Sequence, residues 1–410
     1  YAPVAILITQ AVATLSSIHP YTSFWGYYTR FHGGLLTTIC YTIIYFAALK
    51  WLDTKSTQKI IKMSVGTAFL ISLYGILQHL GIDKNLWVQD VQNRIFSTLG
   101  QPNWLAAYLL PNIFFVLYLS HTNKKIARYA LYLFTALIVA LLFTKSRSGL
   151  LAFALSYFIY WLLMIRQFSF AKVRLDCIRY TLYTVLLVSF IGTPYSPSVL
   201  SLTSRMANQD SAPVAQGTQL ESGGTESGDI RKIVWTGALE LIKNYPILGT
   251  GPETFAYTYY NFRPVQHNMT SEWDFLYNKA HNEYLNIAAG SGLLGLLAYL
   301  AWHYAMASSS LKKIPKSKKV REEQVELTRA FLPVLGASVV GFTITNFFGF
   351  SVIPVYLLMI MIAALALTSQ QVPIKSSYPI FPTTYIIICL TLVYPALLFY
   401  ADYLFARGKT

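Results

Sequence analysis

Three side chains that carry charge or accept protons stand at the edges of long apolar runs in this sequence. Arg147 lies in "FTKSRSGLLAFALSYFIYW", Arg231 lies in "DIRKIVW", and His281 lies in "YNKAHNEYLNIAAG". A guanidinium can hold phosphate oxygens through two parallel hydrogen bonds. An imidazole, with an ordinary pKa of about 6.5, is a natural general base near neutral pH. Together the three residues predict a site that binds phosphate groups and removes a proton.

Each of these residues also has a simpler structural explanation. Arg147 could be an interfacial arginine whose guanidinium reaches water at the membrane surface. Arg231 could form a surface ion pair with Asp229, and His281 could be a hydrated interfacial histidine. The neighbours of His281, Lys279 and Glu283, could tune its basicity, in a direction that the sequence does not determine. These alternatives stay open at the level of residue types.

The motifs of several competing chemistries are missing from the sequence. The seven histidines form no HExxH motif and the cysteines form no ligand pair, so no metal site is expected. No GxxxxGK[ST] or GxGxxG motif opens a helix after a strand, so nucleotide binding is not expected. We therefore predict a reaction that needs neither a metal ion nor a cofactor.

The composition predicts an all-α protein built as a polytopic bundle of transmembrane helices. Hydrophobic residues make up 54% of the 410 residues and charged residues only 12%. A membrane-spanning helix needs about 20 apolar residues, and the sequence contains ten such stretches and a shorter apolar start, 3–18, which we count as the remainder of another, giving about eleven. They lie near residues 3–18, 34–52, 61–80, 104–120, 127–143, 149–165, 180–193, 284–308, 330–349, 351–369 and 381–401.

Lysine and arginine concentrate in alternate loops. Five loops hold 19 of the 32 basic residues and 5 of the 17 acidic ones. The positive-inside rule makes these loops cytoplasmic, so the loops that carry Arg147, Arg231 and His281 are predicted to lie outside. Anionic lipid headgroups explain the net charge of +15, and no nucleic acid is expected as a partner. The basic loops are 50–62, 121–128, 166–179, 309–329 and 370–380; the predicted outer loops are 19–33, 81–103, 144–148 and 194–282.

The predicted organisation has two groups of transmembrane helices, residues 1–193 and 283–403, separated by a large outer loop, residues 194–282. Within this loop, the Ser-, Gly- and Gln-rich stretch 205–229 is expected to be flexible. Residues 230–282 are expected to form an ordered cap.

The cap begins with an amphipathic helical pattern, in which Ile233, Ala238, Leu241 and Ile242 share one side. Residues 404–410 are expected to begin an outer tail of a longer protein, because both ends of the sequence look truncated. Of the three cysteines, Cys40 and Cys389 fall in predicted spans and Cys177 in a predicted cytoplasmic loop, so no disulfide framework is expected.

Four segments, in order along the chain, resemble the O-antigen ligase and polymerase superfamily of bacterial envelope enzymes. They are "STLGQPNWLAAYL", "TKSRSGLLAF", "RKIVWTGALELIKNYPILGTGPETF" and "KAHNEYLNIAAGSGLLGLLAY". The most specific element is His281 followed by ten residues and then Gly292. The long polar stretch 205–229 departs from the family pattern, which leaves the identity of the acceptor open.

The resemblance implies a function and roles for particular residues. Members of the superfamily transfer a glycan from an isoprenoid diphosphate, undecaprenyl diphosphate in bacteria, to a lipid, glycan or protein acceptor. The transfer takes place at the outer face of the cytoplasmic membrane. Arg147 and Arg231 match the arginines that contact the diphosphate, and His281 matches the catalytic histidine. A direct displacement with His281 as general base is expected to invert the anomeric configuration.

Further residues are expected to contact the substrate. Arg30 and His32 in "YYTRFHGG" are predicted on the same outer side, and Lys279 is adjacent to the catalytic histidine. Tyr277, together with Trp273 and the aromatic residues of 255–262, could form a wall against which sugar rings stack.

The leading hypothesis is a glycan ligase, and the close alternative is a polymerase that extends a lipid-linked chain. A polysaccharide flippase or transporter is a third hypothesis. Transporters carry ionisable residues or broken helices near the middle of the membrane. Here the charged candidates cluster at the outer rim, which disfavours transport.

Overall fold

In the computed structural model, the described residues are 2–28, 30–87, 89–198, 227–314, 322–368 and 400. Up to Thr368 they belong to one unit, Tyr1–Gln371. These described residues form helices and no strand, in agreement with the predicted all-α fold. The α-helices are α1 (Ala2–Leu15), α2 (Pro20–Trp25), α3 (Leu35–Trp51), α4 (Thr54–His79), α5 (Pro102–Thr122), α6 (Lys124–Ala127), α7 (Ala130–Phe143), α8 (Arg147–Phe168), α9 (Phe170–Ile191), α11 (Ser227–Asn244), α12 (Phe255–Phe262), α13 (Glu283–Ser310), α14 (Glu322–Phe347) and α15 (Ile353–Thr368), and the 3₁₀ helices are η1 (Ser97–Leu99) and η2 (Val265–Met269).

Five of the described helices are long and apolar enough to cross a membrane: α4, α5, α8, α13 and α14. Four shorter apolar helices accompany them, namely α1, α3, α7 and α15. The prediction of a multi-span membrane protein is therefore confirmed, but the count of eleven spans is not. The span predicted at 381–401 lies outside the described residues, apart from Tyr400.

The predicted loop 166–179 is mostly helical. Helix α8 continues to Phe168, and α9 begins at Phe170 after a single residue, Ser169, whose φ of 72° breaks the helix. The first half of α9 carries several charges, including an exposed ion pair between Arg179 and Asp176 at 2.9 Å. Charged side chains can line a helix that extends beyond its apolar part, so a charged run does not by itself predict a loop. Cys177 consequently lies in α9.

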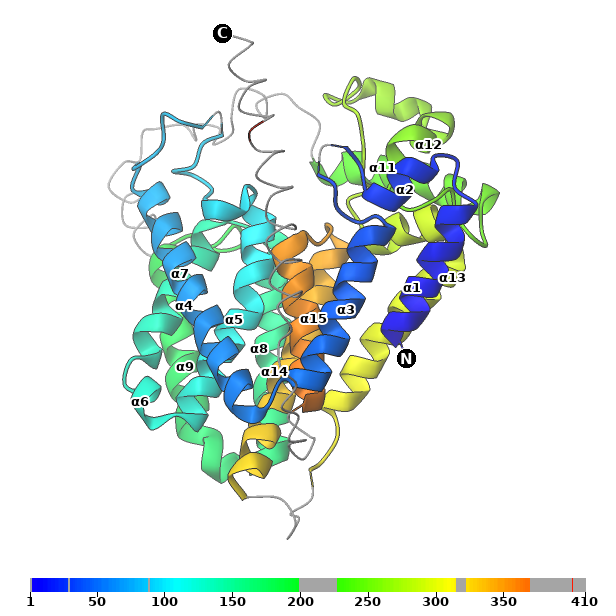
Figure 1. Ribbon diagram of the computed structural model, residues 1–410. Helices are drawn as coiled ribbons and strands as arrows, with labels where there is room; N and C mark the ends of the chain where they lie inside the picture. The colour runs from blue at the N-terminus through cyan, green and yellow to red at the C-terminus, as the bar shows by residue number, and fades with distance from the viewer. Residues whose placement is uncertain are drawn as a thin grey trace, which may run out of the picture. The chain divides into compact units, whose positions relative to one another are not determined.

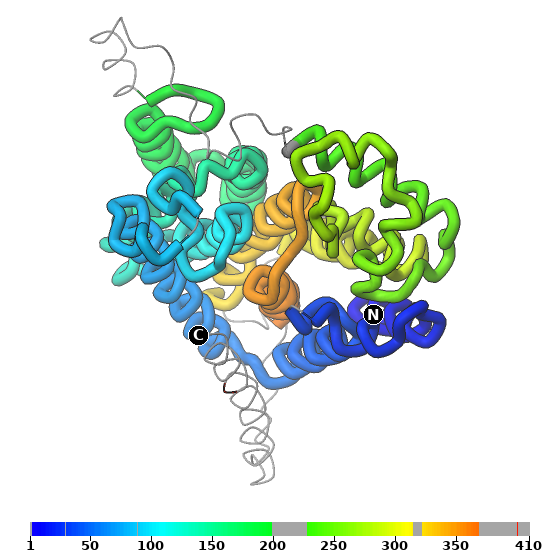
Figure 2. The backbone as a smooth tube through the Cα atoms, turned by 90° about the horizontal axis from the view of Figure 1, so that it is seen from above, coloured from blue at the N-terminus to red at the C-terminus, as the bar shows by residue number. Residues whose placement is uncertain are grey.

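Helix α14 lies at the centre of the unit and contacts α5, α8, α13 and α15. On one side, α5 packs against α4, α7 and α8; on the other, α1 packs against α3 and α13 (Figures 1 and 2). Both α5 and α14 are buried over most of their length. Such central helices are apolar all round, because every face meets another helix.

Residues 227–282, called the cap below, lie at one end of the bundle, which we call the capped end (Figure 1). Val234, Ala238 and Leu241 of α11 are buried against Phe255 and Tyr259 of α12. Of the apolar face predicted for α11, Ala238, Leu241 and Ile242 are buried, whereas Ile233 is only partly so. The cap thus has a small hydrophobic core, which Ala288 and Ala289 of α13 complete.

A turn of the cap docks into a kink of α13. The backbone N–H of Leu293 donates to the carbonyl of Pro246, and that of Gly251 donates to Gly290, each at 2.8 Å. The kink centres on Gly292, whose φ is 67°. A Cβ atom at this position would lie 2.0 Å from the carbonyl oxygen of Ile247, so only glycine fits. This contact gives a physical reason for the spacing between His281 and Gly292, because it fixes the cap on the helix that His281 precedes.

Candidate functional site

A pocket at the capped end brings together residues from five parts of the chain. It encloses about 360 Å³, including its open mouth. We call it the arginine pocket. It is lined by Gln101, Asn103, Trp104 and Ala107 of the α5 region, Ser148 of α8, Arg231 of α11, His281, and Thr345, Asn346, Phe348, Gly349 and Phe350 at the end of α14.

His281 contributes an imidazole that no described residue hydrogen-bonds. Its backbone has a φ of 52°, in the left-handed region that non-glycine residues rarely adopt and that is enriched at functional sites. The rings of Tyr277 and Phe350 meet the imidazole edge-on, with centroids 5.8 and 5.5 Å away. Burial, together with the charges of Arg231 and Arg30, lowers the pKa of His281 to about 4. At neutral pH the imidazole is therefore uncharged and can accept a proton.

Arg231 does not form the surface ion pair that was the alternative explanation for it. Asp229 pairs instead with Lys232, at 2.8 Å, on the exposed side of α11. Arg231 lines the arginine pocket, and within the described chain no carboxylate lies within ion-pair distance of its guanidinium. Burial lowers the pKa of Arg231, but a guanidinium stays charged at neutral pH. The pocket thus contains a cation without a bound counter-charge.

Arg30 lies against two aromatic rings of the same pocket. Its guanidinium carbon is 4.9 Å from the centroid of Phe350 and 5.4 Å from that of Trp104. Aromatic faces attract cations, so these rings hold Arg30 at the pocket edge. Two guanidinium groups therefore act on His281 from different segments of the chain.

Helix N-termini add to the positive potential of the arginine pocket. Gln101 is the N-cap of α5, and Ser148 is the second residue of α8. The α8 N-cap, Ser146, accepts a hydrogen bond from the backbone of Gly149 and donates to Asn103, at 2.7 Å, which ties the two helix starts together. Unpaired backbone N–H groups and the helix dipole favour anions at such ends.

Arg147 is the first residue of α8, but its side chain is exposed and does not line the arginine pocket. Its backbone carbonyl accepts a hydrogen bond from Tyr195, at 3.4 Å. Of the predicted diphosphate-binding residues, Arg231 and Arg30 act on His281, whereas Arg147 lies beside Ser148 in sequence and is not among the residues that line the pocket. Its role remains a prediction.

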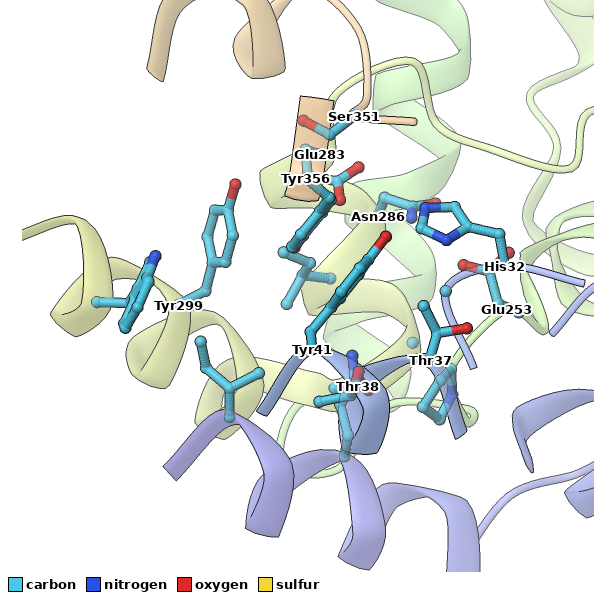
Figure 3. A pocket seen from close by; sticks show the side chains of 18 of the residues that line it. His32, Thr37, Thr38, Tyr41, Glu253, Glu283, Asn286, Tyr299, Ser351 and Tyr356 are labelled. Carbon is cyan, nitrogen blue, oxygen red and sulfur yellow. Dashed lines mark hydrogen bonds between the residues drawn. The ribbon is translucent and has the colours of Figure 1, made fainter. Parts of the chain in front are cut away.

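A second pocket lies next to the first, between α1, α3, α13 and α15. It encloses about 840 Å³, including its open mouth, and we call it the carboxylate pocket (Figure 3). His32 and Lys279, both predicted to contact substrate, line this pocket and not the arginine pocket. Burial, and to a lesser extent the charge of Lys279, lowers the pKa of His32 to about 4.

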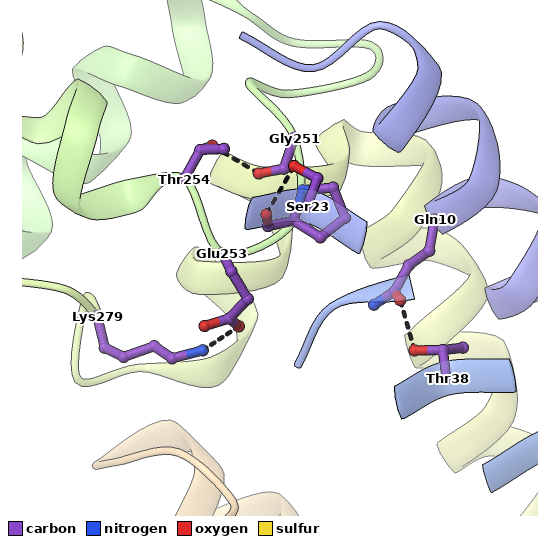
Figure 4. Close-up of polar contacts among 8 residues, drawn as sticks. Gln10, Ser23, Thr38, Gly251, Glu253, Thr254 and Lys279 are labelled. Atoms are coloured by element: carbon purple, nitrogen blue, oxygen red, sulfur yellow. Dashed lines mark hydrogen bonds and ion pairs between the residues drawn. The ribbon is translucent and has the colours of Figure 1, made fainter. Parts of the chain in front are cut away.

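Lys279 forms a buried ion pair with Glu253 of the cap (Figure 4). The two side chains are only 8% and 6% exposed. The ammonium of Lys279 also lies 5.8 Å from the ring centroid of Phe350, which lines the arginine pocket. Lys279 and Phe350 thus form the wall between the two pockets.

The aromatic residues of the cap divide into two sets. Tyr277 and Tyr259 are buried in the interior of the cap, while Tyr260 and Trp273 are exposed. The hydroxyl of Tyr277 donates a hydrogen bond to Glu272. Burial, more than any other cause, raises the pKa of this hydroxyl. The ring of Tyr277 supports His281, and its face is not free for a sugar.

Several lining residues were not singled out from the sequence. Trp104, Asn346 and Phe350 line the arginine pocket, and Tyr41 and Glu253 line the carboxylate pocket. Aromatic residues in apolar runs most often belong to a core, so their types gave no signal. Glu253 stands in "GTGPETF", where its charge beside a turn could have drawn attention. Within the described residues, no three His, Cys, Asp or Glu side chains cluster as metal ligands would.

The apolar helices and the polar pockets at their capped end define a multi-pass membrane protein with a site suited to an anionic substrate. Residues 131–300 match the family model of the O-Antigen ligase. The match runs from α7 through most of α13 and includes Arg147, Arg231 and His281. It confirms the predicted resemblance and indicates a membrane enzyme of glycan assembly, of the O-antigen ligase or polymerase type. No curated protein matches the chain.

Proposed function

We propose that the arginine pocket transfers a saccharide from a lipid diphosphate, of the undecaprenyl type, to a hydroxyl acceptor at the outer face of the membrane. One observation carries the proposal: a neutral histidine lies beside two guanidinium groups in a pocket at the N-termini of two helices. The guanidinium groups and helix ends suit a diphosphate. The histidine suits an acceptor hydroxyl that must lose a proton.

In the proposed reaction, the acceptor oxygen forms a bond to the anomeric carbon while the bond from that carbon to the diphosphate oxygen breaks. The bonding electron pair leaves with the lipid diphosphate, whose growing negative charge Arg231 and Arg30 stabilise. The acceptor proton passes to a ring nitrogen of His281, which later releases it to solvent or to the departing diphosphate. Attack from the face opposite the leaving group inverts the anomeric configuration.

The distribution of basic residues supports an outer location for the capped end. Basic residues stand at or beside the turns at the other end of the bundle: Lys50 at the end of α3, Lys124 and Lys125 after α5, Arg166 at the end of α8, and Lys312 and Lys313 after α13 (Figure 1). Basic turns of this kind stay in the cytoplasm. The capped end then lies at the outer face of the membrane, where it can meet a lipid carrier whose glycan is displayed outside.

The experiment that tests the proposal is the change His281→Ala, with carrier binding and saccharide transfer measured separately in nanodiscs. Loss of a general base lowers transfer by about 10²–10⁴-fold, while binding of the lipid diphosphate stays within about twofold of wild type. His121→Ala, at the opposite end of the bundle, is the matched control and leaves both unchanged. Transfer at the normal rate in His281→Ala would show that His281 is not the base.

The same assay separates a ligase from a polymerase. Purified protein is incubated with the lipid-linked saccharide alone, and then with a second, chemically different acceptor. Products that need the second acceptor indicate a ligase. A ladder of longer chains from the donor alone indicates the polymerase alternative.

A further inference from the structure

The carboxylate pocket contains polar side chains that no other part of the described protein satisfies. Glu283 is 7% exposed and Tyr41 is 9% exposed, yet the Oε2 atom of Glu283 and the hydroxyl of Tyr41 have no hydrogen-bond partner. The Nδ1 atom of His32 is also buried without one. Figure 3 shows the three groups directed toward one space, which Asn286 also faces.

Buried polar atoms without partners are costly, and native proteins leave few of them. Three such atoms around one cavity indicate that the cavity is completed by something with hydrogen bonds to offer. The three differ in kind, because a carboxylate oxygen only accepts, a tyrosine hydroxyl donates and accepts, and a neutral imidazole nitrogen does one or the other. A hydroxyl group can match all of them, since it donates one hydrogen bond and accepts others.

The charges around the pocket balance, which disfavours a strongly charged occupant. Lys279 and Glu253 neutralise each other in the buried ion pair. The charges of Lys279 and Glu253 also act on Glu283 with opposite sign, and the guanidinium of Arg30 acts on Glu253 and on His32. A cation would meet Lys279 and Arg30, and an anion would meet Glu253 and Glu283. A neutral ligand meets no such penalty.

The pocket is fixed to the same elements as the proposed reaction centre. Glu283 follows His281 by two residues and begins α13, and Lys279 precedes His281 by two residues. Ser351 lines the carboxylate pocket while its neighbour Phe350 lines the arginine pocket. A group bound in one pocket is therefore next to a group bound in the other.

We propose that the polar end of the carboxylate pocket binds a neutral sugar ring, whose hydroxyl groups pair with Glu283, Tyr41 and His32. This inference rests on the proposed function, because it makes the ring part of one of the two saccharide substrates. The ring belongs either to the donor glycan or to a glycosylated acceptor, and both sources present the same hydroxyl chemistry.

The test uses the full chain in nanodiscs and ligand-observed NMR with methyl glucoside, methyl galactoside and methyl N-acetylglucosaminide as probes. Glucosamine and glucuronate serve as charged counterparts. We expect saturable binding of at least one neutral probe, and weaker binding of both charged sugars. Tyr41→Phe lowers the affinity about fivefold, the effect of one neutral hydrogen bond. Glu283→Gln lowers it by about the same factor or more, because an amide nitrogen replaces one acceptor oxygen.

The matched control is Tyr45→Phe, which removes a hydroxyl one turn further along α3, from a buried tyrosine that does not line the pocket. It leaves sugar binding unchanged. Thermal unfolding separates binding from folding, since removing the unpartnered hydroxyl of Tyr41 leaves the melting temperature unchanged or raises it. Equal effects of Tyr41→Phe and Tyr45→Phe would overturn the proposal, as would preferential binding of a charged sugar. So would the lack of saturation by any neutral probe up to about 0.1 M, far weaker than a millimolar site.

The transfer assay distinguishes the source of the ring. In Tyr41→Phe, a raised KM for the donor alone assigns the ring to the donor glycan, and a raised KM for the acceptor alone assigns it to the acceptor. Unchanged KM values for both, with transfer intact, overturn the inference and leave the proposed function standing. If wild-type protein shows no transfer, the proposed function fails, and the NMR experiment still decides whether the pocket binds sugar.

Discussion

The two pockets at the capped end differ in how their charges are matched. In the arginine pocket, the charges of Arg231 and, from the pocket edge, Arg30 act on His281, and within the described residues no carboxylate pairs with either guanidinium. In the carboxylate pocket, Lys279 is paired with Glu253 in a buried contact. An unpaired cation is available to a substrate, whereas a paired one belongs to the structure. Basic side chains at the same end of the bundle are thus expected to serve binding in one pocket and stability in the other.

The largest expected effect comes from breaking the buried ion pair. Lys279→Met leaves the carboxylate of Glu253 buried and without a partner, which costs about 3–5 kcal/mol of the free energy of unfolding. The matched control is Lys243→Met, which breaks an exposed pair with Glu240 and costs less than about 1 kcal/mol. Denaturant titration in mild detergent measures both. Equal free energies of unfolding for Lys279→Met and Lys243→Met would mean that the buried pair does not stabilise the fold.

A smaller effect, on binding and not on stability, is expected from Arg231→Ala. Loss of a charge-assisted contact weakens binding of the lipid diphosphate by about 10–100-fold. Arg231→Lys restores only part of this affinity, because an ammonium lacks the planar fork. Arg179→Ala, on α9, is the control and leaves binding unchanged. Arg147→Ala sharpens the comparison, since an effect as large as that of Arg231→Ala would assign its exposed guanidinium to the diphosphate site.

The smallest effect is a pH dependence that reports the burial of His281 and the positive charges around it. Because its pKa is about 4 in the free protein, kcat/KM stays level between pH 8 and 6 and falls as the pH drops toward 4. A bound diphosphate opposes the arginines, so the acidic limb of kcat lies at higher pH than that of kcat/KM. A midpoint of kcat/KM near the ordinary value of about 6.5 would contradict the burial of His281 beside two unpaired guanidinium groups.

The same shift predicts the sign of a stability change. The pKa of His281 is lower in the folded protein than in the unfolded chain, so the unfolded chain binds more protons between about pH 6.5 and 4. The contribution of His281 to stability is complete above about pH 6.5 and decreases as the pH falls toward 4. Denaturant titrations across this range, on wild type and on His281→Asn, measure this contribution.

Particular residues show what was predictable. The spacing from His281 to Gly292 was the most specific element of the family resemblance, and the kink at Gly292, where Ile247 approaches closely, gives it a physical reason. Arg231 was ambiguous in sequence because Asp229 stands two residues away, and only the helix shows that Lys232 takes that carboxylate. Tyr41 could not be found at all, since a tyrosine in an apolar run is usually part of a core.

The sequence by itself determined the all-helical membrane class, the uneven placement of basic residues and the family resemblance, because apolar length, charge placement and motif spacing are local properties of the chain. Tertiary structure decided which charges have partners. Glu253 and Lys279 are 26 residues apart, and Arg30 reaches the rings of Trp104 and Phe350 from a distant loop. Whether a charged side chain supports the fold or remains free for a substrate depends on such long-range contacts, which residue type and spacing do not encode.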